Sequence, residues 1–79
     1  MTERVRTALI EAIREETDAF DVVITDATTA ADVPGWDSMA HVRIVMNAEN
    51  RLGKKFTIAA TYEARNVAEL VAALDAQMA

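Results

Sequence analysis

Residues 33–39 read Val-Pro-Gly-Trp-Asp-Ser-Met and mark the place where a long irregular segment gives way to an apolar helix. The Pro-Gly pair interrupts any preceding helix. Asp37 is a suitable N-cap for a helix over about residues 38–52, which puts the hydroxyl of Ser38 in the first turn, within reach of solvent. Free backbone N–H groups and the positive end of the helix dipole favour an anion there. The position therefore suits a phosphorylated serine, although capping alone also explains the pattern.

Three stretches of the chain repeat apolar residues at the spacing of an α-helix. They predict helices over about residues 3–16 and 38–52 and from residue 66 onward, and Gly53 is suited to end the second helix with a positive φ. The repeating positions are Val5, Ala8, Leu9, Ala12 and Ile13 in the first helix, Met39, Val42, Val45, Met46 and Leu52 in the second, and Val67, Leu70, Val71, Leu74 and Met78 in the last. We also predict one short helical stretch over residues 59–65.

A long segment, residues 18–37, separates the first two helices. Loops of this length are uncommon in small domains and are often functional. Phe20, Val22 and Ile24 are apolar and would hold this one against the core. We therefore predict a single domain over residues 1–79, with an all-α fold: a small antiparallel four-helix bundle with a long loop between helices one and two and a short third helix.

The composition narrows the possible classes of function. The chain has 79 residues, 52 % apolar and 27 % charged, as is typical of one small globular domain. It has no cysteine, which excludes a disulfide framework and a cysteine nucleophile and fits a reducing compartment. Its net charge of −5 opposes binding to DNA or RNA. We find no apolar run long enough for a membrane helix and no export signal, and we expect a cytoplasmic monomer.

Asp37, Ser38 and His41 lie close enough together to raise the question of a hydrolase of the Ser-His-Asp type. Such enzymes often present their serine in a G-x-S-x-G turn, and here Ala40 occupies the position of the second glycine. The single histidine and the scattered carboxylates match no spacing typical of zinc or calcium ligands. We therefore expect no catalytic residue and no metal site, and we interpret His41 as a solvated helix residue or a contact to a partner.

Residues 37–49 read Asp-Ser-Met-Ala-His-Val-Arg-Ile-Val-Met-Asn-Ala-Glu and resemble the signature of the acyl carrier protein family, which usually has leucine where Met39 stands. The helices and the long loop also match in order and spacing, so the resemblance covers nearly the whole chain. It implies that Ser38 receives 4'-phosphopantetheine from coenzyme A through a separate phosphopantetheinyl transferase, and that an acyl group is held as a thioester on the arm. It also implies that Asp37 takes part in recognition by the transferase and in holding a magnesium ion during loading.

A carrier role agrees with the residue content. A thioester needs a thiol and the chain has no cysteine, so the sulfur must come from a cofactor. Tethering raises the effective concentration of the acyl group at a docked enzyme. The chain would then be no enzyme but a cosubstrate of its partners, which the resemblance implies to be the transferase, an acyl-loading ligase or acyltransferase, and synthase or tailoring enzymes.

The expected partner surface lies in and beside the second helix and consists of Trp36, Met39, His41, Val42, Arg43 and Glu49. In fatty-acid carriers this helix is typically rich in acids, whereas residues 38–52 contain one acid and two arginines. The departure favours a dedicated partner in polyketide or other secondary-metabolite biosynthesis over primary fatty acid biosynthesis. Met39 is expected beside the root of the arm or in the core. Trp36 either covers the apolar residues of the loop or belongs to the partner surface.

Two other functions remain open from the sequence. Aminoacyl and peptidyl carrier proteins share the fold. The aspartate before the serine favours acyl cargo, but only weakly. An unmodified helical adaptor would instead use the methionines of the second helix to hold a partner helix.

Overall fold

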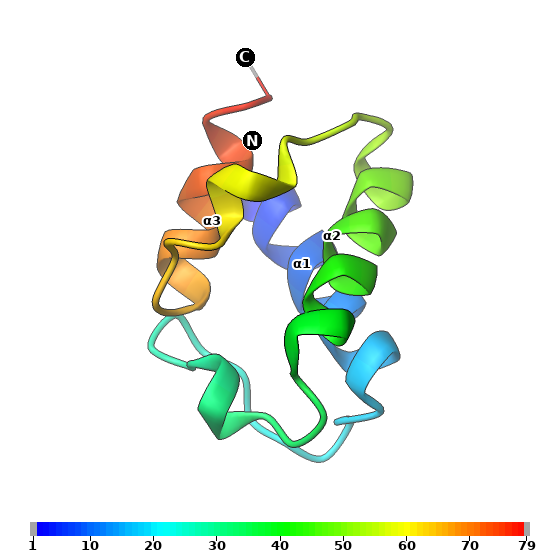
Figure 1. Ribbon diagram of the computed structural model, residues 1–79, viewed down its shortest axis with the longest axis vertical. Coiled ribbons are helices and arrows are strands. Elements are labelled where there is room, and N and C mark those ends of the chain that lie inside the picture. The colour runs from blue at the N-terminus through cyan, green and yellow to red at the C-terminus, as the bar shows by residue number, and fades with distance from the viewer. Residues whose placement is uncertain (1, 79) are drawn as a thin grey trace.

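The computed structural model describes residues 2–78 as three α-helices joined by two irregular connections, each of which contains a short 3-10 helix (Figure 1). In chain order the elements are α1 (Thr2–Thr17), η1 (Ala30–Asp32), α2 (Ser38–Leu52), η2 (Ile58–Thr61) and α3 (Val67–Asp75). The described residues contain no strand, and none of their helices is both long and apolar enough to cross a membrane. The predicted all-helical class is confirmed, and α2 has the predicted bounds.

The short third helix of the predicted four-helix bundle is not present as an α-helix in the described part of the chain, so the bundle has three α-helices there. The stretch predicted over residues 59–65 forms η2 instead, a single turn in which the hydroxyl of Thr61 donates to the carbonyl of Ile58 at 2.6 Å. A short helix forms few hydrogen bonds, and these hardly offset the free-energy cost of nucleating the first turn. Asn66, only a few residues further on, already caps the next helix. The turn therefore ends before it can become an α-helix.

Helix α1 supplies the centre of the core and packs against both α2 and α3. Its five predicted apolar positions are all buried, as are the first four of the five in the last helix. Met78, the fifth, lies beyond the end of α3 and is half-buried against the core. Periodicity predicted these two faces correctly because each helix carries one narrow apolar stripe.

The predicted apolar face of α2 is confirmed for Val45 and Leu52 and wrong for its other three residues. Met39, Val42 and Met46 are 71 %, 36 % and 56 % exposed. The buried face consists of Ala40, Ile44, Val45, Ala48 and Leu52. Two apolar stripes run side by side on this helix, and periodicity does not choose between them. The inward stripe includes two alanines, whose small side chains let α2 approach α1 closely.

Hydrogen bonds from a side chain of α1 hold the first part of the connection between α1 and α2. The guanidinium of Arg14 donates to the carbonyls of Ala19, Phe20 and Val22 at 2.9 to 3.2 Å. Ile24 is buried, as predicted, and Val22 packs partly against the core, but Phe20 is 61 % exposed. Because Arg14 satisfies these carbonyls, the chain turns sharply without needing Phe20 as an anchor.

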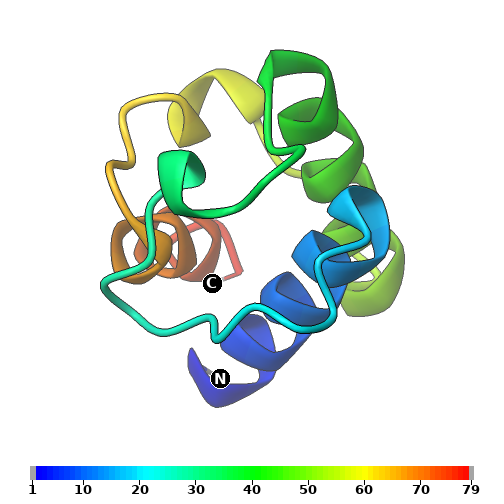
Figure 2. The ribbon, with the colours of Figure 1, turned by 90° about the horizontal axis from the view of Figure 1, so that it is seen from below.

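The same connection is tied to the start of α3. The backbone N–H groups of Val67 and Ala68 donate to the carbonyls of Thr28 and Asp26, both at 2.9 Å. Figure 2 shows the connection crossing the end of the molecule between α1, α3 and α2. These bonds satisfy donors that the first turn of a helix leaves free, and they bring the loop, the start of α2 and the start of α3 to one end of the fold.

Both ends of α2 depend on particular residues. Gly35 has a φ of +89°, and a Cβ there would lie 3.3 Å from the carbonyl oxygen of Thr17. The carboxylate of Asp37 accepts from the backbone N–H of Ala40 at 2.8 Å, which confirms the predicted N-cap. Gly53 ends the helix with a φ of +68°, as predicted. The serine after Asp37 is thus held at the first position of a well-defined helix.

Charged side chains join the outer edges of α1 and α2. Arg51 pairs with Glu11 at 2.9 Å and with Glu15 at 2.7 Å, and Asn47 donates to Glu15 at 2.8 Å and to Glu16 at 3.0 Å. The bond from Asn47 and the neighbouring Arg51 hold the pKa of Glu15 below its usual value. The two bases of α2 thus face acids of α1, since Arg43 also lies 3.4 Å from Glu16.

Candidate functional site

Ser38 is the first residue of α2 and is exposed. Its hydroxyl makes no hydrogen bond to any residue between 2 and 78, because the N-capping role belongs to the carboxylate of Asp37. The turn that precedes it contains Gly35 in a conformation that L side chains rarely adopt. The hydroxyl is therefore presented to solvent at the positive end of a helix, where a negatively charged substituent is favoured.

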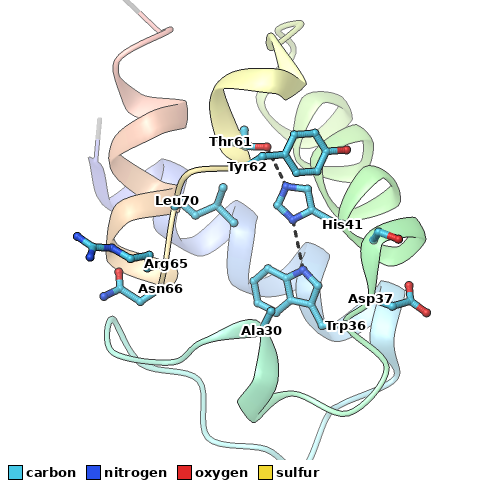
Figure 3. A pocket seen from close by; sticks show the side chains of 11 residues that line it. Ala30, Trp36, Asp37, His41, Thr61, Tyr62, Arg65, Asn66 and Leu70 are labelled. Carbon is cyan, nitrogen blue, oxygen red and sulfur yellow. Dashed lines mark hydrogen bonds between the residues drawn. The ribbon is translucent and has the colours of Figure 1, made fainter.

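A cavity of about 310 Å³ opens beside Ser38 (Figure 3). It is formed where η1, the start of α2, η2 and the start of α3 meet. Trp36, His41 and Tyr62 line one side of it, and Arg65, Asn66 and Leu70 line another. Its volume lies at the lower end of the range of small-molecule sites.

A chain of hydrogen bonds fixes the imidazole of His41 at this cavity. The indole N–H of Trp36 donates to Nδ1 of His41 at 3.3 Å, and Nε2 of His41 lies 2.8 Å from the hydroxyl oxygen of Thr61. Thr61 is fully buried and uses its own proton toward the carbonyl of Ile58. Because an indole N–H only donates, Nδ1 must accept and Nε2 must carry the proton. The ring is therefore held neutral, in one tautomer.

The three rings at the cavity also stack. The centroids of His41 and Tyr62 are 4.9 Å apart, and those of Trp36 and His41 are 6.2 Å apart, with interplanar angles of 30° and 20°. Burial in this stack lowers the pKa of His41 below its ordinary value of 6.5. The direction agrees with the hydrogen bonds, since a proton on Nδ1 would face the N–H of Trp36.

The structure gathers part of the predicted site at one place. Trp36, Asp37, Ser38 and His41 all border the cavity. Trp36 packs partly against the core, in line with its predicted covering role. His41 is half-buried in the stack rather than standing in solvent, because its two nitrogens find partners in Trp36 and Thr61. Neither bond can be predicted from the spacing of these residues in the sequence.

The remaining residues of the expected partner surface lie elsewhere on α2. Met39 and Val42 face outward together with Arg43, and none of the three lines the cavity. Of the two places expected for Met39, the core is therefore wrong, and a position beside the root of the arm stays a prediction. Glu49 is turned toward the following connection, where its carboxylate accepts from the backbone N–H of Phe56 at 2.8 Å. Glu49 is thus tied to the end of its own helix.

Seven residues of the cavity were missed as site residues by the sequence analysis, namely Ala30, Thr61, Tyr62, Ala64, Arg65, Asn66 and Leu70. Asn66 also caps α3 by accepting from the N–H of Glu69 at 2.9 Å. Nothing in the local pattern around these residues signals a site. All but Ala30 reach Ser38 only because η2 and α3 fold back against the start of α2.

The chain belongs to the phosphopantetheine attachment site family, whose model matches residues 3–74. The resemblance to acyl carrier proteins is thereby confirmed at the level of the family. Comparisons with curated proteins and with solved structures give no match. Members of the family attach 4'-phosphopantetheine covalently.

The residues around α2 fit such a group. A phosphodiester needs a serine oxygen that is exposed and free of other bonds, and Ser38 has both properties within the described chain. The first amide groups of a helix favour its negative charge. When bound, the group supplies the terminal thiol that the chain itself lacks, since the sequence contains no cysteine.

Proposed function

We propose that this chain is an acyl carrier domain that holds acyl groups as thioesters on 4'-phosphopantetheine attached to Oγ of Ser38, and that residues 1–79 form this one domain. The observation that carries the proposal is the free, exposed hydroxyl at the head of α2, inside a chain that matches the phosphopantetheine attachment family. The arm would be long enough to present the acyl group to several enzymes in turn, while the folded body is recognised by each.

The activation of Ser38 would come from the loading enzyme. The only histidine of the chain is His41, and its nitrogens are both engaged, with Trp36 and with Thr61. It is therefore unsuited to take the proton of the Ser38 hydroxyl. This argues against an Asp37-Ser38-His41 hydrolase and in favour of a carrier that is a substrate of its partners.

Asp37 would assist loading through its position. Its carboxylate is exposed and directly precedes Ser38, and one of its oxygens accepts from the N–H of Ala40. Among residues 2–78 no group of three or more potential ligands is placed to hold a metal ion. A magnesium ion shared during loading would thus take most of its ligands from the phosphopantetheinyl transferase and the phosphates of coenzyme A.

The outward strip of α2 is proposed as the main partner surface. Met39, Val42 and Arg43 form it, with Trp36 and His41 at its edge toward the cavity, whereas Glu49 would contribute only at the far end of the helix. Partners would include an acyl-loading ligase or acyltransferase and synthase or tailoring enzymes. The shortage of acids on this strip supports a pathway of polyketide or other secondary metabolism.

The test is to co-express the chain with a broad-specificity phosphopantetheinyl transferase and to weigh the intact protein. We expect a gain of one phosphopantetheinyl group in the wild type and none in Ser38→Ala. The variant should keep its fold, because replacing an exposed side chain usually changes stability by less than about 0.5 kcal/mol. Thermal unfolding of both proteins provides the control. Failure of the folded wild type to gain mass with several transferases would contradict the proposal and favour a helical adaptor.

A further inference from the structure

The cavity beside Ser38 has two chemically different sides. One consists of the aromatic rings of Trp36, His41 and Tyr62, and the other includes Arg65, Asn66 and the buried side chain of Leu70 (Figure 3). Nothing in the proposed carrier role requires this arrangement, since a carrier needs only the free serine. The arrangement therefore calls for an explanation of its own.

The aromatic side is rigid and has few unmet polar groups. Trp36 gives its only N–H to His41, and His41 gives its own proton to Thr61. The ring nitrogens of Trp36 and His41 thus already have hydrogen-bond partners within the protein. What remains for a ligand is aromatic surface, which pairs best with another flat π-system in an offset or edge-to-face arrangement.

The opposite side places no charged or amide head group inside the cavity. The guanidinium of Arg65 is 86 % exposed, lies 3.5 Å from Glu69 and points away from the cavity (Figure 3). The side-chain amide of Asn66, whose oxygen caps α3, also points away from it. The buried side chain of Leu70 points inward, so an occupant would meet apolar surface on this side as well.

The volume limits the size of the occupant. At about 310 Å³ the cavity is larger than the roughly 150 Å³ of an apolar cavity that holds benzene. One or two flat rings, or a conjugated chain of similar extent, would fit. An occupant that reached deeper would meet Leu70, which is only 2 % exposed and belongs to the core.

We propose that this cavity receives the acyl group of the loaded carrier and selects flat, conjugated acyl groups over saturated alkyl chains. The proposal rests on the proposed carrier function. Tyr62 and Trp36 are the specificity-determining residues, because they supply the aromatic surface. The selected class includes aryl and unsaturated acyl groups.

The first experiment does not require loading. The N-acetylcysteamine thioesters of cinnamic acid and of octanoic acid, which are similar in carbon count, are titrated into the unmodified protein. The readout is the indole N–H resonance of Trp36, which is the only tryptophan in the chain. We expect the cinnamoyl thioester to shift this resonance saturably and the octanoyl thioester to shift it much less. Equal shifts with both compounds, or none with either, would overturn the proposal.

The second experiment uses the loaded carrier. Cinnamoyl and octanoyl groups are placed on Ser38 through the arm, and the thioesters are cleaved with hydroxylamine. Each cargo is compared on the wild type and on Tyr62→Ala, so that the intrinsic reactivity of each thioester cancels. We expect the cinnamoyl group to be cleaved about 2- to 10-fold more slowly on the wild type, the range that one aromatic pair supports, and the octanoyl group to be cleaved equally on both.

Matched variants separate stacking from damage to the fold. Tyr62→Phe keeps the ring and should keep the protection, and Phe20→Ala, which removes another exposed aromatic side chain that does not line the cavity, should leave it unchanged. Loss of protection in Phe20→Ala, or a full shift of the Trp36 resonance by the arm without cargo, would refute the selection of acyl groups. If Ser38 accepts no arm at all, the carrier function fails, and the titration alone decides whether the cavity binds the flat thioester.

Discussion

Ser38 and His41 are three residues apart on α2, yet their surroundings give them different properties. The serine hydroxyl is exposed and makes no bond within residues 2–78, whereas the imidazole is held between Trp36 and Thr61. The difference arises because Asp37 takes over the capping of the helix and leaves Ser38 free. At this scale the chain presents a modifiable group but does not activate it.

The neutral state of His41 makes the stability of the fold depend on pH. Burial lowers the pKa of His41 below 6.5, so the unfolded chain takes up the proton first as the pH falls. The stabilisation is complete above pH 6.5 and is lost as the pH falls through the pKa of the folded state. The pKa values of Glu15 and Glu69 are also lowered, from 4.5, and their contributions are lost in a more acidic range.

We expect the melting temperature of the wild type to fall between about pH 7.5 and pH 5.5, by an amount equivalent to less than about 1 kcal/mol because the ring is only half-buried. In His41→Gln, which has an amide N–H for Thr61 but no titrating ring, this fall should be smaller. Thermal unfolding followed by circular dichroism at both pH values measures the effect. The same pH dependence in both proteins would show that another group is responsible.

At the scale of elements, α2 is defined by what happens at its two ends. Gly35 and Gly53 both have a positive φ, but only Gly35 lies against another part of the backbone, the carbonyl of Thr17. The first end therefore depends on tertiary contact with α1, and the second depends on local conformation alone. This contact fixes where Ser38 lies relative to the rest of the protein.

Alanine at each glycine distinguishes these two cases. Gly53→Ala should cost about 1 kcal/mol of unfolding free energy, the usual penalty of a left-handed L residue. Gly35→Ala should cost clearly more, because its Cβ would also lie 3.3 Å from the oxygen of Thr17, where the backbone has little freedom to move. Urea denaturation of both variants tests the difference. Equal losses would show that the approach of the loop to α1 is easily relaxed.

At the scale of the whole molecule, folding brings acids from the first half of the chain next to bases from the second half. Residues 1–37 contain 9 acids and 3 bases, and residues 38–79 contain 4 acids and 5 bases. Packing sets Arg51 against Glu11 and Glu15, so part of the acidic excess is paired at the edge between α1 and α2. The outward strip of α2 keeps its apolar residues and Arg43, whose guanidinium lies 3.4 Å from Glu16 of α1. An enzyme that expects an acidic helix would meet no acid on the strip itself.

We therefore expect a malonyl transferase of fatty acid synthesis to load the holo protein slowly. Arg43→Glu should speed this reaction, because charges at the rim of an interface act mainly on the association rate. Lys55→Glu makes the same change of charge at an exposed position beyond α2 and serves as the control. Malonylation followed by intact mass gives both rates. Rapid loading of the wild type would contradict the proposed place outside primary fatty acid synthesis.

The sequence is sufficient to predict the inward residues of α1 and α3. It is also sufficient to predict the caps at Asp37 and Asn66 and the serine at the first position of α2. Each depends on neighbours within one or two helical turns, so spacing and side-chain chemistry are sufficient to locate it. The all-helical class and the family signature follow from the same local information. The proposed attachment residue, Ser38, can therefore be identified from a short stretch of the chain.

The cavity could be found only in the folded molecule. Trp36, Tyr62 and Leu70 belong to different segments, and the bond between His41 and Thr61 spans 20 residues of sequence. Periodicity likewise left two apolar stripes on α2 and could not tell which one faces α1. Such choices depend on which surfaces pack most closely and which buried polar groups find partners, and these are decided by contacts between elements rather than within them.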